Sequence, residues 1–202
     1  MGRGWLWCGA MVLVMTATVA AQTPRSPVMF THGSTVNLFA GAATAAPSRT
    51  AAIGGGAVGW ELTPRFAIEG SGEWMEWGSG SHGFGTAITA QQGLAGGHDL
   101  MPFVMGGVGL YHAEFDRPGR AMPGFYSRRM TDPSRFETTA AFTDPTVVFG
   151  GGVNAFLNRH WAIRPDVREM VVLRDSRSYF VTTVAVHVAY HFEDHPVTPT
   201  VR

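Results

Sequence analysis

The stretch VTTVAVHVAYHF, residues Val181 to Phe192, decides the fold because its two histidines can be interpreted in two ways. On a helix, His187 and His191 would lie on one face, four positions apart, where two imidazoles can hold a metal ion. The β-branched residues alternate with other residues over this whole stretch, however, and a period of two predicts a strand. Four residues of strand span about 13 Å, whereas metal–imidazole bonds measure about 2 Å. We therefore expect a strand and no metal site.

The composition is typical of a single domain with an unusual architecture. The chain has 202 residues, enough for one sizeable core, and its 15 basic residues, all arginine, balance 15 acidic ones. This balance argues against nucleic-acid binding, which requires a basic surface. The chain also contains 26 glycines and 12 prolines, and it shows no long helical pattern. Such a composition favours a β-architecture that tolerates glycine.

The first 21 residues have the pattern of a secretory signal peptide. Arg3 precedes a short apolar run, and Val19–Ala21 forms a small-residue cleavage site. The alternative is a retained membrane anchor, but the apolar run is short for one. Cleavage near Ala21 would remove Cys8, the single cysteine, and would exclude disulfides and thiol chemistry in the exported chain. Residues 22–33 are expected to lead into the domain.

Eight segments of alternating hydrophobicity follow, and residues typical of turns separate them. Each segment is as long as, or longer than, the roughly 9–11 residues that a tilted strand needs to cross a bilayer. After the signal, no stretch approaches the roughly 18 consecutive apolar residues of a membrane helix. The segments are residues 34–45, 50–62, 66–77, 86–95, 103–115, 146–157, 161–172 and 179–192.

The two faces of each segment differ in polarity. In residues 161–172, Ile163 and Val167 share one face, and Arg164 and Arg168 share the other. A soluble barrel turns its apolar face inward, whereas a membrane barrel turns it toward lipid. The aromatic residues of apolar parity lie near the strand ends, which is typical of the girdles of a membrane barrel. They are Trp60, Phe66, Trp161, Tyr190 and Phe192 at one rim, and Trp74 and Phe180 at the other.

The connections also favour a membrane barrel, because short and long links alternate. The short links are Thr63–Arg65, Gly96–Pro102 and Asn158–His160, and the longer ones are Gly78–Gly85, Asp116–Pro145 and Leu173–Ser178. The link Ala46–Arg49 is shorter than this pattern leads us to expect. We predict an all-β fold over residues 34–193, an eight-stranded antiparallel up-and-down transmembrane β-barrel. Its first strand closes on its last, because an open edge cannot lie in hydrocarbon. Residues 194–202 would form a periplasmic tail.

Three stretches resemble one family in particular. They are GWELTPRFAIEGSGEW, MPFVMGGVGLY and GGGVNAFLNRHWAIRPDVRE, followed by a last strand that ends in Phe192. Together they resemble the bacterial outer-membrane protein β-barrel domain, the small barrels similar to the transmembrane part of outer-membrane protein A. The resemblance covers about residues 31–192 and implies an outer-membrane location, but the family has no shared catalytic motif. It also implies that Phe192 is recognised by the outer-membrane assembly machinery, although ten residues follow it here.

The inward parity is expected to form a polar network in the lumen. Eight strands leave an interior just wide enough for side chains, and an unpaired buried charge is costly, so Glu and Arg should pair across the lumen. We expect Arg164 and Arg168 to meet one of three glutamates. The alternative is a narrow gated pore or a proton-linked site. The residues are Asn37, Glu61, Glu69, Glu73, Arg164, Asp166, Arg168, His187 and His191.

The long link Asp116–Pro145 is the candidate for contacts outside the membrane. It mixes aromatic residues with arginines, which could contact lipopolysaccharide phosphates or a protein partner; the alternative is a solvated surface loop. The arginines are Arg117, Arg120, Arg128, Arg129 and Arg135. We expect a monomer in contact with outer-membrane lipid and lipopolysaccharide, and no bound cofactor.

Enzymatic alternatives have little support in the sequence. Some eight-stranded barrels resemble lipid A deacylases, which use a His-x-Ser pair, but His32–Ser34 is the only such pair and would lie at the inner rim. The glycine runs Gly54–Gly59 and Phe149–Phe156 are not followed by a helix or a lysine, as a phosphate-binding loop would be. We expect a non-enzymatic barrel with a structural or adhesive role. The alternatives are a pore or a soluble, lipocalin-like barrel that binds a small apolar ligand.

Overall fold

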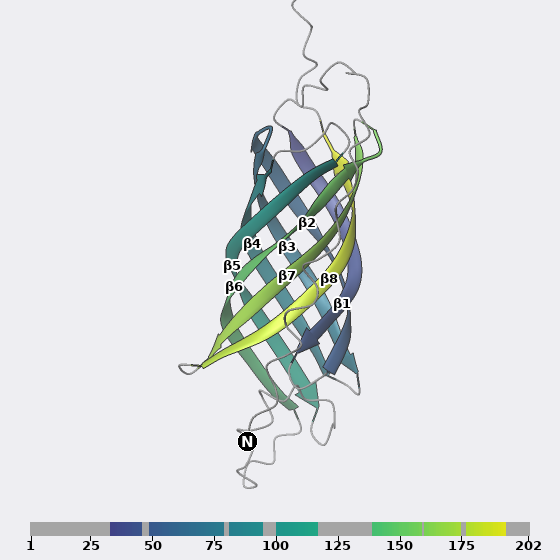
Figure 1. Cartoon of the computed structure of the whole chain (residues 1–202). Helices are drawn as coiled ribbons and strands as arrows, with labels where there is room; N and C mark the ends of the chain where they lie inside the picture. Colours follow the sequence, from purple (N-terminus) through teal and green to yellow (C-terminus); the bar gives the residue numbers. More distant parts are fainter. Residues whose placement is uncertain are drawn as a thin grey trace, which may run out of the picture.

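The computed structural model describes residues 33–45, 49–78, 81–94, 100–116, 139–158, 160–174 and 177–192. These residues form eight strands (Figure 1): β1 Ser34–Ala45, β2 Arg49–Thr63, β3 Phe66–Gly78, β4 Ser81–Gly93, β5 Leu100–Asp116, β6 Thr139–Phe156, β7 Trp161–Arg174 and β8 Arg177–His191. The predicted signal peptide, the tail and the lead-in except Gly33 lie outside the described residues. Within the described ranges, no helix is long and apolar enough to cross a membrane.

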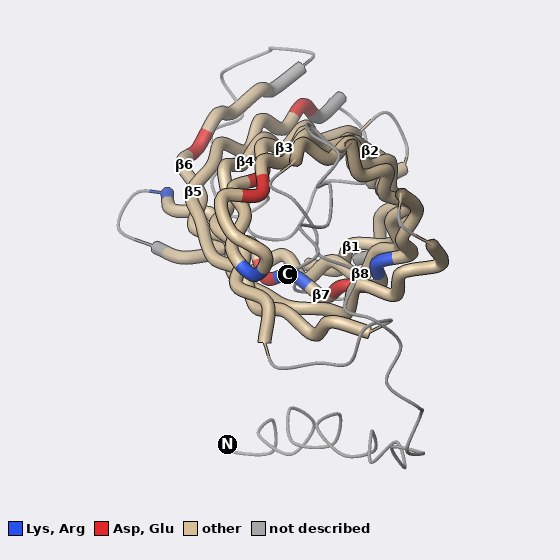
Figure 2. Tube along the Cα trace, turned by 90° about the horizontal axis from the view of Figure 1, so that it is seen from above, with Lys and Arg blue, Asp and Glu red and all other residues tan. Residues whose placement is uncertain are grey.

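The eight strands form one closed antiparallel barrel, as predicted. Each strand pairs with the next along the chain, and β1 pairs with β8 from Thr35↔His191 to Ala45↔Val181. Figure 2 shows the closed ring from above. A circuit of paired residues that leaves β1 at Thr35 returns to it at Ala45, ten residues further along the strand. This shift fixes which side chains of distant strands lie at the same height in the lumen.

The barrel is inverted relative to a soluble protein, because its apolar face points outward. On β8, Val184, Val186 and Val188 are each about half exposed, whereas Ala185 and His187 between them are buried. Twenty-five large hydrophobic side chains of the described residues are exposed in this way, far more than isolated surface residues would explain. The outer face is therefore suited to lipid, and a soluble lipocalin-like barrel does not fit it.

Aromatic residues lie at both rims of the outer face. At the rim where β1 begins and β8 ends, the terminal rim, Trp161 meets Tyr190 edge to face at 5.0 Å, and Tyr190 meets Phe192 at 4.8 Å. At the opposite rim, the loop rim, Trp74 and Phe180 are exposed. The two groups bound the apolar belt, as interfacial girdles do.

The strands extend further toward the loop rim than predicted, so the links there are shorter. β4 begins at Ser81 rather than at residue 86, and β6 begins at Thr139 rather than at residue 146. The links from β3 to β4 and from β7 to β8 are residues 79–80 and 175–176, and Gly78 takes a positive φ of 81° at the first of them. Beyond the bilayer, backbone hydrogen bonds maintain strand pairing without an apolar face, so alternation alone understates strand length. Of the predicted long links, only that between β5 and β6 remains long.

Pro145 lies inside β6, although the sequence placed it at the end of a loop. Its position is tolerated because β6 pairs with β5 as far as Thr139, whereas its pairing with β7 begins only at Thr146. This part of β6 is an edge, where a residue without an N–H leaves no ladder partner unsatisfied.

Candidate functional site

The polar residues predicted to point inward lie in the lumen, toward the terminal rim. Glu69, Arg164 and His187 are at most 4% exposed, and Asn37, Asp166 and Arg168 are also buried. Glu61 and His191 lie at the rim itself, where the His191 Nδ1 is 2.9 Å from a carboxylate oxygen of Glu61. The period-two parity of strands β1, β2, β3, β7 and β8 turns all these side chains to the inner face.

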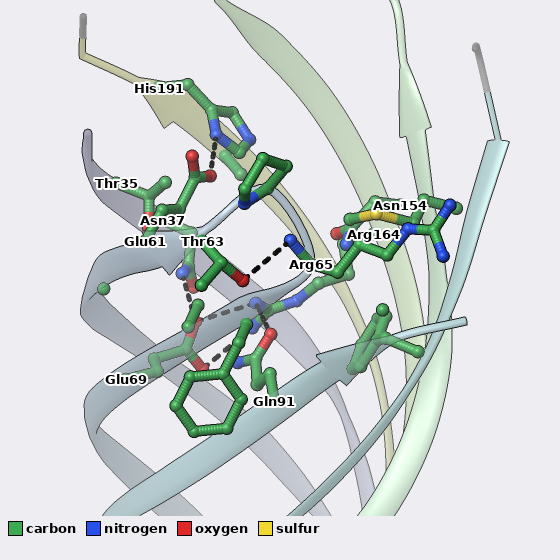
Figure 3. Close-up of a pocket in the computed structure, with 18 residues that line it drawn as sticks. Thr35, Asn37, Glu61, Thr63, Arg65, Glu69, Gln91, Asn154, Arg164 and His191 are labelled. Atoms are coloured by element: carbon green, nitrogen blue, oxygen red, sulfur yellow. Dashed lines mark hydrogen bonds and ion pairs between the residues drawn. The ribbon is translucent and has the colours of Figure 1, made fainter. Parts of the chain in front are cut away.

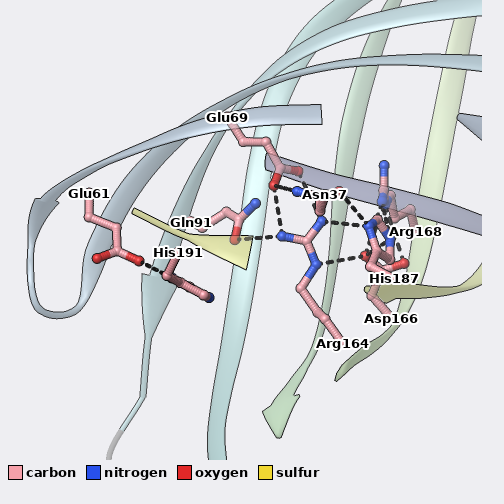
Figure 4. A network of polar contacts seen from close by, with 9 residues as sticks. All are labelled: Asn37, Glu61, Glu69, Gln91, Arg164, Asp166, Arg168, His187 and His191. Carbon is pink, nitrogen blue, oxygen red and sulfur yellow. Dashed lines mark hydrogen bonds and ion pairs between the residues drawn. The ribbon is translucent and has the colours of Figure 1, made fainter. Parts of the chain in front are cut away.

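Arg164 and Glu69 form the strongest contact of the network (Figure 4). Arg164 Nη1 donates to Glu69 Oε2 at 2.7 Å, and Nη2 donates to Oε1 at 3.1 Å, so the pair is bidentate across the lumen from β7 to β3. Asn37 Nδ2 donates to the same carboxylate at 3.0 Å, and Gln91 Oε1 accepts from Arg164 at 3.5 Å. A buried ion pair needs such additional hydrogen bonds to offset its desolvation.

His187 links this pair to a second arginine. Its Nδ1 is 2.9 Å from Arg164 Nη2 and 2.9 Å from Asn37 Oδ1. Its Nε2 is 2.6 Å from Arg168 Nη2 and 2.9 Å from Asp166 Oδ2. Each ring nitrogen thus faces one donor and one acceptor, so either neutral tautomer makes one bond at each nitrogen. The ring therefore bridges the two arginines without requiring a charge of its own.

Arg168 does not meet a glutamate, which corrects the prediction for this residue. It pairs with Asp166, two residues earlier on the same strand and face, through Nε at 3.2 Å and Nη2 at 3.1 Å to Oδ2. Its guanidinium also lies over the Phe39 ring, 5.0 Å from the centroid. Asp166, the carboxylate nearest to Arg168 in the sequence, accepts its hydrogen bonds, so Arg168 needs no partner across the lumen.

Glu73 takes no part in these bonds. Its Oε2 is buried and has no hydrogen-bond partner among the described residues. A cavity of about 10 Å³ adjoins it, lined by Ser71, Arg168 and Thr183 among others. This is close to the smallest space that holds a water molecule. Glu73 therefore contributes much less to the network than Glu69, four residues earlier on the same face.

Toward the loop rim an apolar layer fills the lumen, which the sequence analysis missed. We define the apolar layer as the buried side chains Met75, Trp77, Tyr111, Met170, Val172 and Val181. Trp77 Nε1 donates to Tyr111 Oη at 3.0 Å, so its two polar atoms are bonded to each other. The signal was present on β3 and β8, where the inward residues become apolar toward this rim, from Glu73 to Met75 and Trp77 and from Thr183 to Val181.

Beyond the apolar layer a further ion pair lies at the loop rim. Arg174 Nη1 donates to Asp144 Oδ2 at 3.0 Å, and its guanidinium lies 4.0 Å from the centroid of the Phe142 ring. The lumen thus contains, from the terminal rim to the loop rim, a polar network, an apolar layer and an ion pair.

The mouth at the terminal rim leaves a cavity of about 50 Å³ (Figure 3). Thr35, Glu61, Asn154, Arg164 and His191 are among the residues around it. Pockets for small ligands usually measure about 300–1,000 Å³. The space is sufficient for water and too small for an apolar ligand.

The last predictions concern metal ligands, the His-x-Ser pair and the arginines of the β5–β6 link. In the described part of the chain, no three His, Cys, Asp or Glu side chains are grouped so as to hold a metal ion. His32 and the five arginines of the β5–β6 link, Arg117 to Arg135, lie outside the described residues.

Comparison with known proteins identifies the fold through structure alone. No family profile matches the sequence, and no curated protein matches it. Neisserial surface protein A superposes with a TM-score of 0.58 at 8% identity, over 80% of this chain and 97% of that one. The N-terminal β-barrel domain of Pseudomonas aeruginosa OprF gives 0.53 at 16% identity, over 80% of this chain and all of that domain. The chain has the fold of the small outer-membrane β-barrels. Because the identities are low, the likeness establishes the fold and not the activity.

The two glutamates of β3 provide a matched test of the network. Glu69→Gln removes the charge that compensates Arg164, and breaking a buried pair in this way should cost about 3–5 kcal/mol of unfolding free energy. Glu73→Gln changes a carboxyl whose buried Oε2 has no hydrogen-bond partner among the described residues, and it should cost at most about 1 kcal/mol. Urea unfolding of the refolded barrel in lipid vesicles measures both. Equal destabilisation by the two substitutions would contradict the network described above.

Proposed function

We propose that this protein is a non-enzymatic outer-membrane barrel with a closed lumen and a structural or adhesive role. The apolar layer carries the proposal. Hydrated ions would have to pass between Met75, Tyr111 and Val181, all essentially inaccessible to solvent. Eight strands leave no spare width to move these side chains aside. A barrel sealed in this way acts through its outer surface and its loops.

The predicted signal peptide and the apolar belt support an outer-membrane location. The terminal rim has only short links, residues 64–65, 94–99 and 157–160, whereas the loop rim has three short links and the single long one, so the β5–β6 link alone distinguishes the two rims. The long β5–β6 link, residues 117–138, would then face outward. Its five arginines and its aromatic residues suit contact with lipopolysaccharide phosphates, because guanidinium groups bind phosphate in a bidentate manner. Phe192, which follows β8, would be the residue that the outer-membrane assembly machinery recognises.

A narrow gated pore is the second candidate. The polar network and the open mouth at the terminal rim favour it, because a cavity large enough for water adjoins charged side chains there. The pore requires the apolar layer to open, whereas the structural role requires it to stay closed. The two candidates therefore differ in a measurable conductance.

Planar-bilayer recording separates these candidates. We expect no conductance steps from the wild-type barrel, and none from Arg164→Ala, because the apolar layer still seals the lumen. The double variant Trp77→Ala, Tyr111→Ala removes the two largest rings of that layer and should produce small steps. Reproducible steps from the wild-type protein would overturn the closed-lumen proposal.

The adhesive half of the proposal is tested in the β5–β6 link. Replacing the five arginines with glutamine should weaken binding of the refolded barrel to immobilised lipopolysaccharide at least tenfold, because the phosphate contacts are lost. Removal of the three aromatic residues alone, Phe125→Ser, Tyr126→Ser and Phe136→Ser, serves as the control and should weaken binding less. Unchanged binding after the loss of all five arginines would refute this role of the link.

A further inference from the structure

One side of strand β6 has no neighbouring strand near the loop rim. β6 pairs with β5 as far as Thr139, but it pairs with β7 only from Thr146 onward. In that register Asp144 lies beside Arg174, where β7 ends. Within the described ranges, residues Thr139–Thr143 therefore have a partner strand on one side and none on the other. We call the backbone of these residues the β6 edge.

The direction of the free backbone groups follows from the ladder of β5. Pro102 O accepts a hydrogen bond from Leu94 N on β4 at 2.8 Å, so the polar backbone groups of Pro102 point away from β6. Its partner Val153 on β6 therefore directs its N–H and C=O toward β7, as every second residue of the strand does. The register with β5 has no bulge along β6, so Ala141 and Thr143 follow the same parity. Their free N–H and C=O groups form a template for another extended chain.

The β6 edge lies beyond the aromatic girdle of the loop rim. Thr143 pairs with His112, and the row of paired residues continues through β4 to Trp74 on β3. Such rows rise toward the loop rim from β1 to β8, because a circuit of paired residues returns to β1 ten residues closer to that rim. Thr143 therefore lies further out than Trp74, and the rest of the edge lies further out still. In the orientation proposed above, the edge faces the outside of the cell.

The sequence of the β6 edge lacks the residues that usually protect a free edge. Natural edges are made unsuitable for pairing by lysine, proline, inward-pointing charges or bulges. The edge sequence, TAAFT, contains no charged residue and no proline. Pro145 has the same parity as Ala141, and its missing N–H faces β7, where the pairing of the two strands ends. The edge beyond Pro145 is thus open to pairing.

A second copy of the chain in the same membrane does not fit this edge. Two copies would be related by a twofold axis along the membrane normal. Such an axis reverses only the in-plane component of a strand's direction, so two related strands are antiparallel only if they lie flat in the membrane plane. Barrel strands are tilted by about 35–45° from the barrel axis, so two copies of β6 would cross instead of pairing. A different polypeptide is therefore the partner that fits.

The side chains of the β6 edge indicate which kind of segment fits. Ala141 and Thr143 are exposed on the outer side, and Phe142 is half-buried on the inner side, under the Arg174 guanidinium. Arg174 pairs with Asp144, so the charges that β6 and β7 place next to the edge match each other. Aromatic and β-branched residues pair favourably across strands with phenylalanine and threonine. The matching segment is therefore uncharged and rich in β-branched or aromatic residues.

We propose that the β6 edge binds an extended, uncharged segment of another protein outside the cell, which adds to the barrel as a strand next to β6. Backbone hydrogen bonds to Ala141 and Thr143 hold the segment, and its side chains give specificity. The proposal rests on the outward orientation and the adhesive role proposed above. It adds a protein partner and a binding mode that do not depend on the arginines of the β5–β6 link.

Amide hydrogen exchange in the refolded barrel tests the edge directly. Without a partner, the N–H groups of Ala141 and Thr143 should exchange with water much faster than those of Ala140 and Phe142, which point toward β5. A peptide of alternating threonine and valine, about seven residues long, should slow exchange at Ala141 and Thr143 roughly tenfold or more, and the effect should saturate. The same peptide with every amide N-methylated cannot donate these bonds and should need a roughly tenfold higher concentration.

Two variants of one residue locate the site. Ala141→Pro removes a free N–H of the edge and leaves the pairing with β5 intact, so it should weaken peptide binding about tenfold or more. Ala141→Val retains this N–H and should bind the peptide as well as the wild type does. Exchange at Phe142 reports on the pairing of β5 with β6 and should stay slow in both variants.

Three results would overturn the proposal. They are slow exchange at Ala141 and Thr143 without peptide, equal affinity for the two peptides, and undiminished binding by Ala141→Pro. Slow exchange at every barrel concentration would show that another segment of the chain covers the edge, and slow exchange only at high barrel concentration would show a second copy there. A barrel that binds lipopolysaccharide through its arginines but gives any of these results would keep the adhesive role and refute this inference.

Discussion

Closure of β1 on β8 is the constraint on which the rest of the structure depends. In hydrocarbon no water is available to the N–H and C=O groups of a strand, so each must bond to a neighbouring strand. Eleven residues of β1, from Thr35 to Ala45, find partners on β8 and remove the last free edge. Closure over eight strands with a shift of ten residues also sets the width of the lumen, which side chains then fill.

The narrow lumen accounts for the form of the polar network. A charge placed there is not hydrated by bulk water, so leaving it without hydrogen bonds from other side chains is costly. Arg164 meets this requirement across the lumen, and Arg168 meets it along its own strand. His187 joins them with contacts that either tautomer supports. The apolar layer next to this network needs no such partners, apart from the one bond between Trp77 and Tyr111.

The sequence predicts the architecture well because alternation with a period of two can be recognised within each strand. Closure of the barrel then turns the same face of every strand toward the lumen. Val184 and His187 could be assigned to opposite faces from β8 alone. The pairing of Glu69 with Arg164, 95 residues apart, could not be assigned, because the heights of their side chains depend on the register of several intervening strand pairs. The Arg168–Asp166 pair was visible in the sequence as two charges on one face. It was missed because partners were expected only across the lumen.

The features at the loop rim were harder to predict for a different reason. Hydrophobic alternation follows the bilayer and not the backbone ladder, so it gave no sign that β4 begins at Ser81 or that β6 begins at Thr139. The hollow on the outer face of β3, β4 and β5 depends on the absence of a side chain at Gly70, next to residues of two other strands. A single strand does not contain that information.

The central claim, a closed barrel with lipid outside and side chains inside, is tested most directly by spin labels along β8. Single cysteines from Phe180 to Ala189 can be introduced against a background without other cysteines once the segment containing Cys8 is removed. In lipid vesicles, labels at the even positions should be accessible to molecular oxygen and inaccessible to a water-soluble nickel reagent. Labels at the odd positions should be protected from both. Access of the nickel reagent to the even positions would contradict the account, because it would place the apolar face in water.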